Sequence, residues 1–133
     1  MATLAQRLVL FWVLMCICMM LHFNYNLSGL FYGIDLKVPD ASGSQPPQLI
    51  VLRLLFNVVP MAFAVALMYG AQRWLRWTVF VASGLYVLAH AGHLLGELRH
   101  TPPDYSQWLL LTFTLLLALL QAITAWRWVR AAQ

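Results

Sequence analysis

Four apolar stretches, each long enough to cross a lipid bilayer, limit what this chain can fold into more than any other feature. A helix needs about 20 residues to span a hydrocarbon core about 30 Å thick. Only 9% of the residues are charged, whereas a soluble domain carries about 25%. We therefore expect an all-α integral membrane protein: a single membrane domain, residues 1–133, folded as an antiparallel bundle of four transmembrane helices. The spans are residues 4–27, 49–69, 77–96 and 108–126.

Proline-containing loops separate the first span from the second and the third from the fourth. The loop at residues 31–48 contains Pro39, Pro46 and Pro47, and the loop at 98–107 contains Pro102-Pro103-Asp104. Prolines of this kind end one helix and allow the next to begin. The remaining connection, residues 70–76, is short, so the second and third spans should be antiparallel neighbours. We expect the first span to remain uncleaved, because no small-x-small motif follows it.

The charged residues predict an orientation in the membrane. In a four-span chain the N-terminus, the connection at 70–76 and the C-terminal tail share one side, and cytoplasmic segments are rich in Lys and Arg. That side carries five arginines and no acidic residue: Arg7, Arg73, Arg76, Arg127 and Arg130. The other side carries every acidic residue: Asp35, Asp40, Glu97 and Asp104. Both termini should therefore be cytoplasmic, with the loops at 31–48 and 98–107 outside.

The same charges exclude one class of function. The net charge is +4, but the cationic residues are scattered in ones and twos, without the basic block or motif of a nucleic-acid-binding protein. We expect the plasma membrane as the location, and the short, compact chain favours a bacterial inner membrane. Cys16 and Cys18 are two residues apart and point to opposite sides of a helix, so we expect two buried thiols and no disulfide.

The third span carries a polar stripe. Successive members are three or four residues apart: Ser83, Tyr86, His90, His93, Glu97 and His100. This spacing places them on one face of a helix. Two other spans bring polar groups to the same depth, the outer third of the membrane: His22 from the first, and Arg53 and Asn57 from the second. Because lipid satisfies none of these groups, Arg53 should turn inward to meet Glu97, a histidine or Asn57.

These side chains predict an outward-facing polar pocket that binds a metal ion or a small polar ligand. Neutral imidazoles of His22, His90 and His93 suit Zn²⁺, Cu²⁺ or Fe²⁺, with Glu97 as an alternative third ligand. The ligand-binding candidates are Arg53, Asn57, Tyr86 and Glu97. A haem between the first and third spans and a quinone beside Tyr86 are further possibilities. His93 and Glu97 have the spacing of a base and its orienting partner, but no signature of a reaction accompanies them, so we assign no catalytic residue.

A structural role is the alternative. The chain would then be a non-catalytic accessory or scaffolding subunit of a larger membrane complex, or a homo-oligomer, with lipid around it and the polar stripes holding the bundle together. Gly92 and Gly96 form a G-x-x-x-G pair on the opposite face of the third span, where another helix could approach. Asn57 would cap a carbonyl freed by Pro60. A second stripe, repeating every seven residues, would supply hydrogen bonds between helices: Gln107, Thr114 and Gln121.

Overall fold

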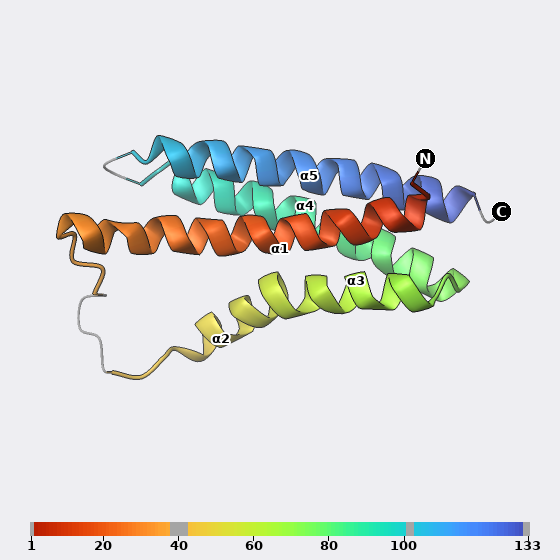
Figure 1. The fold of residues 1–133 in the computed structure, drawn as a ribbon, viewed down its shortest axis with the longest axis horizontal. Helices are drawn as coiled ribbons and strands as arrows, with labels where there is room; N and C mark the ends of the chain where they lie inside the picture. Colours follow the sequence, from red (N-terminus) through yellow and green to blue (C-terminus); the bar gives the residue numbers. More distant parts are fainter. Residues whose placement is uncertain (1, 38–42, 101–102, 132–133) are drawn as a thin grey trace.

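The computed structural model describes residues 2–37, 43–100 and 103–131, and within these ranges the chain is helical, without a strand (Figure 1). Four of its helices are long and apolar enough to cross a membrane, as the sequence predicts. In chain order the elements are α1 (Leu4–Ser28), the 3₁₀ turn η1 (Gly29–Tyr32), α2 (Pro47–Arg53), the π-helical segment η2 (Leu54–Val58), α3 (Val59–Tyr69), α4 (Arg73–Glu97) and α5 (Tyr105–Arg130).

The helix ends follow from local chemistry. Thr3 begins α1 with a reciprocal capping box, in which its hydroxyl accepts from the Gln6 N–H and the Gln6 side chain accepts from the Thr3 N–H. Asp104 caps α5 by accepting from the N–H groups of Ser106 and Gln107. Gly33 ends η1 with a φ of 74°, a conformation that glycine adopts without strain.

The connection before α4 is shorter than the sequence predicts. We expected a link over residues 70–76, but α4 already begins at Arg73. The side chain of Arg76 stabilises this early start, because its Nε donates to the Ala71 carbonyl and its guanidinium donates to the Trp128 carbonyl on α5, both at 2.9 Å. The predicted loop residues Pro39 and Pro102 lie outside the described residues.

α1 and α5 form the middle of the packing. α5 packs against both α4 and α1, and α1 also packs against α3. Trp12 of α1 stacks on Phe63 of α3 with ring centroids 4.8 Å apart, and meets the edge of Tyr86 of α4 at 5.0 Å. In contrast, every residue of α2 is exposed, and α2 diverges from α1 in Figure 1.

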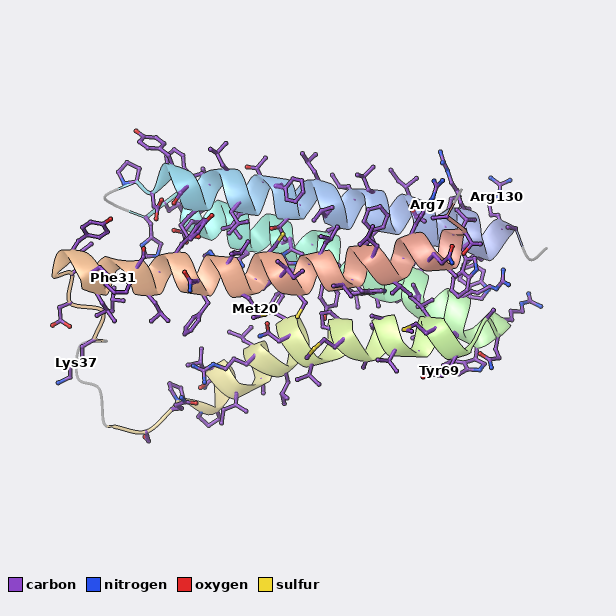
Figure 2. All side chains as sticks on the ribbon, in the orientation of Figure 1. Arg7, Met20, Phe31, Lys37, Tyr69 and Arg130 are labelled. Carbon is purple, nitrogen blue, oxygen red and sulfur yellow. The ribbon has the colours of Figure 1, made fainter. Side chains whose placement is uncertain are left out.

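The two termini lie at the same end of the molecule, while α1 ends and α5 begins at the opposite end (Figure 1). We call these the terminal end and the loop end. Figure 2 shows Arg7 and Arg130 at the terminal end, and Phe31 and Lys37 at the loop end.

The second helix that is long and apolar enough to cross a membrane, Pro47–Tyr69, consists of α2, η2 and α3. The π-helical segment η2 interrupts it just before Pro60. The Val59 N–H bonds to the Leu54 carbonyl, five residues back, and Pro60 has no N–H to offer. The Leu55 carbonyl therefore has no donor from its own helix, and the Tyr86 hydroxyl of α4 donates to it instead. Nearby, the Cys16 thiol of α1 donates to the Asn57 carbonyl at 3.6 Å. The irregular turn thus links three helices.

We expect Tyr86→Phe to lower the free energy of unfolding by about 1–3 kcal/mol, because the Leu55 carbonyl would be left without a donor in an apolar setting. Tyr69→Phe is the matched control, since Tyr69 is 84% exposed. Unfolding of both variants in mixed detergent micelles gives the comparison. Equal stability of the two variants would show that the contact between Tyr86 and Leu55 contributes nothing.

Candidate functional site

The polar stripe of α4 faces the interior of the bundle along its middle turns. Ser83, Tyr86 and His90 are buried, while His93 and Glu97 are half-buried and His100 is exposed. Ser83 and Tyr86, the buried members of the stripe other than His90, each have a polar partner. Ser83 accepts from the Gln121 amide of α5 at 3.1 Å and donates to the Val79 carbonyl, and Tyr86 donates to Leu55.

His90 is the exception on this stripe. It is 1% exposed, and neither ring nitrogen has a hydrogen-bond partner among the described residues. Its ring lies between aromatic neighbours, with centroids 5.4 Å from Phe56 of η2 and 6.0 Å from Tyr86. Buried polar atoms are nearly always hydrogen-bonded, so an imidazole without a partner calls for a specific explanation.

His22 of α1 is held in one orientation by Gln107 of α5. The Gln107 Nε2 donates to the His22 carbonyl at 3.1 Å, so its Oε1 is the amide atom that lies 2.7 Å from the His22 Nδ1. An amide oxygen only accepts, and Nδ1 must therefore carry the proton. The Nε2 of His22 keeps its lone pair, and the Asn26 amide nitrogen lies 3.5 Å from it.

His93 lies against His22. Their ring centroids are 4.6 Å apart and the rings are perpendicular. The structure thus brings the three predicted metal-ligating histidines into one region, with Phe56 between the side chains of His90 and His93 at centroid distances of 5.4 and 6.4 Å. We call His22, His90 and His93 the histidine cluster. Within the described residues, however, no three His, Cys, Asp or Glu side chains lie close enough to hold a metal ion together.

Arg53 does not turn inward as we expected. It is exposed, and its guanidinium donates to the Gln45 side chain at 2.9 Å. The reason is its position in α2, which begins at Pro47 and is exposed throughout. The long side chain therefore extends toward the N-terminal end of the helix, where Gln45 lies. Asn57 is half-buried and donates to the Arg53 carbonyl at 3.1 Å, and does not cap a carbonyl that Pro60 frees.

A pocket of about 540 Å³ opens at the loop end, where α1 and η1 meet the start of α5. None of the candidate residues from the sequence lines it. Asn26 connects the two regions, because it lines the pocket and also approaches His22. The lining residues are Tyr25, Asn26, Ser28, Gly29, Tyr32, Ile34, Leu36, Pro103, Asp104, Tyr105 and Ser106.

Sequence reasoning did not include Gln107 or Phe56 in the site. Gln107 had a signal, because its seven-residue spacing from Thr114 and Gln121 indicated hydrogen bonds between helices. Two members of that stripe make such bonds, Gln107 to His22 and Gln121 to Ser83. Thr114 donates to the Leu110 carbonyl of its own helix. Phe56 had no signal, since one more apolar residue in an apolar span carries no information about its neighbours.

The cap on α5 should make stability depend on pH. Hydrogen bonds from the Ser106 side chain and from the N–H groups of Gln107 and Ser106 lower the pKa of Asp104, against a smaller effect of burial. The ionised Asp104 carboxylate therefore stabilises the fold fully above the unfolded pKa of about 3.9. This stabilisation is lost as the pH falls through the lower pKa that Asp104 has in the folded protein. We expect the unfolding free energy of the wild type, compared with that of Asp104→Asn, to decrease as the pH falls through and below the unfolded value of about 3.9. Parallel pH profiles of the two proteins would contradict this.

Comparisons with protein families, with curated proteins and with solved structures find no match to this chain. Function must therefore be inferred from the geometry. The strongest geometric feature is the buried histidine without a partner, in a cluster that contacts a pocket through Asn26.

Proposed function

We propose that this chain is an integral membrane protein with four antiparallel spans and both termini in the cytoplasm. Two observations support this. Four helices have the required length and apolar composition, and the arginines of the termini gather at the terminal end, as Arg7 and Arg130 show in Figure 2. The excess of Lys and Arg on cytoplasmic segments gives the orientation. The plasma membrane, and in particular a bacterial inner membrane, is the location we propose.

Thiol labelling tests this topology. In a Cys16→Ala, Cys18→Ala background, Lys37→Cys reports on the loop end and Arg127→Cys on the terminal end. We expect a membrane-impermeant maleimide to label Lys37→Cys in intact bacterial spheroplasts, and Arg127→Cys only after permeabilisation. The reverse pattern would contradict the proposed orientation, and labelling of both in intact spheroplasts would contradict membrane spanning.

We propose further that the histidine cluster binds a metal ion or a small polar ligand, which enters from the outer side of the membrane. The observation that carries this proposal is His90, whose two ring nitrogens are buried without a hydrogen-bond partner in the part of the chain that the structure describes. A buried polar group in that state costs about 1–3 kcal/mol. A bound ion or molecule that used the His90 lone pair or N–H would remove this cost.

The neighbours of His90 define the extent of the proposed site. Tyr86 lies one turn deeper on α4 and Glu97 one turn beyond His93, so these two residues border the histidine cluster on both sides. Arg53 would contribute to the site only if α2 moved toward the bundle, because its side chain is exposed and donates to Gln45. Asn57 belongs to η2, which already contacts α4 through Phe56 and His90. The ligand would enter from the loop end, where Asn26 lies between the pocket and His22.

Replacing His90 by Phe tests the proposal, because the ring is similar in size and has no polar atom. If the site holds a ligand, the wild type purified from the membrane should carry bound metal or a non-covalent molecule in elemental analysis and native mass spectrometry. A ligand that uses the His90 ring should be lost in His90→Phe and kept in the control His100→Phe. If the site is empty, neither protein carries a ligand, and His90→Phe is as stable as the wild type or more stable, because an unpaired polar group has been removed.

The empty result would favour the second candidate function, an accessory subunit of a membrane complex. A specific feature of α4 supports this candidate. A Cβ atom added at Gly84, Gly92 or Gly96 would meet nothing within 4 Å, and Leu85 and Leu88 on the same side are more than half exposed. Small residues on a face of this kind allow another helix to approach closely.

A further inference from the structure

We infer that the ligand of the histidine cluster is a divalent transition-metal ion, held by the Nε2 of His22 and the ring of His93. This inference rests on the proposed function and narrows its ligand to one class. It rests on the geometry of three side chains from three helices, His22 of α1, His93 of α4 and Gln107 of α5.

Gln107 gives His22 the arrangement that metal-binding histidines have. Such histidines almost always donate their second ring N–H to a carboxylate, a carbonyl or water, which fixes the tautomer and the ring orientation. Here the Nδ1 of His22 lies 2.7 Å from the Gln107 carbonyl oxygen. The bond from the Gln107 amide nitrogen to the His22 carbonyl fixes the amide in turn. The lone pair therefore belongs to Nε2, the nitrogen that remains without a short hydrogen bond.

His93 is placed where it can share an ion with His22. Among the described residues no hydrogen bond involves the His93 ring, and its centroid is 4.6 Å from that of His22. Two imidazoles on one tetrahedral ion, with bonds of about 2.0–2.1 Å, have ring centroids about 5 Å apart. The observed separation is therefore close to that of two rings that share an ion.

The donor set selects the kind of ion. Two neutral imidazoles suit Zn²⁺, Cu²⁺, Ni²⁺ or Co²⁺, whereas Mg²⁺ and Ca²⁺ require oxygen ligands. Because no third His, Cys, Asp or Glu of the described residues is close enough to join a metal group, water would complete the coordination. The pocket at the loop end would supply this water, because Asn26 lines the pocket and its amide nitrogen lies 3.5 Å from Nε2.

The role of Gln107 gives the inference a readout that a merely structural histidine pair would not show. Gln107→Met keeps a side chain of similar length but removes the acceptor for the Nδ1 proton. Loss of such a partner weakens metal binding about 10–100-fold. Gln107→Glu supplies a carboxylate to the same nitrogen, so it should bind metal at least as tightly as the wild type.

The experiment titrates the full-length protein in detergent, after chelator treatment, with Co²⁺ followed by visible absorption and with Zn²⁺ followed by calorimetry. We expect one ion per chain, loss of binding in His22→Gln and His93→Gln, unchanged binding in the control His100→Gln, and no competition from Mg²⁺. Thermal unfolding without metal confirms that each variant is folded, and the weaker binding of Gln107→Met serves as the test where a histidine variant is not folded.

The inference is overturned if the wild type binds no ion, or if binding survives His22→Gln and His93→Gln together. These outcomes are separable from failure of the proposed function. An organic molecule that co-purifies with the wild type and is lost in His90→Phe would retain the proposed function and reject the metal.

Discussion

The polar groups on these apolar helices must find their partners inside the bundle, and the arrangement of the molecule depends on that constraint. Apolar packing is non-directional, so leucine contacts alone would allow the helices to slide or rotate against each other. Three polar contacts between helices fix the positions instead: His22 with Gln107, Ser83 with Gln121 and Tyr86 with the Leu55 carbonyl. Each joins a different pair of elements: α1 with α5, α4 with α5, and α4 with η2.

The contact between Tyr86 and Leu55 shows how an irregularity in one helix specifies its neighbour. Pro60 and the π-helical turn before it leave a carbonyl without a donor, and only a hydroxyl or amide from another helix can supply one. Tyr86 does so, and its ring then borders Trp12 and His90. The position of His90 is therefore tied to a backbone defect in another helix, although the two do not bond to each other.

Much of the fold follows from the sequence because hydrophobic length and helical spacing are local properties. The four long helices and the alignment of Ser83, Tyr86 and His90 on one face belong to this part. The hydrogen bond from Arg76, in the first turn of α4, to the Trp128 carbonyl does not, because the two residues are distant in sequence. Arg53 was wrongly expected to turn inward, because the spacing of residues within α2 says nothing about whether that helix packs. The pocket was equally unpredictable, since it is formed where three segments meet.

The chemical case depends on the difference between His22 and His90. His22 is oriented by Gln107 and approached by Asn26, so a structural role would suffice to explain its burial. His90 has no such partner, and a structural role alone leaves its cost unexplained. The inferred metal ion uses the lone pair that Gln107 leaves on His22. It does not use the His90 ring, whose unpaired nitrogens support the wider proposal that the histidine cluster binds a ligand.

The ring nitrogens of the histidines test this directly. Solid-state NMR of the ¹⁵N-histidine-labelled protein in lipid bilayers, recorded as purified and after chelator treatment, reports the proton and the ligand at each nitrogen. We expect His22 to be protonated at Nδ1 in both samples, and the resonances of His22 and His93 to shift when metal is removed. Identical spectra before and after treatment, with His22 protonated at Nε2, would contradict a ligand site built on these histidines.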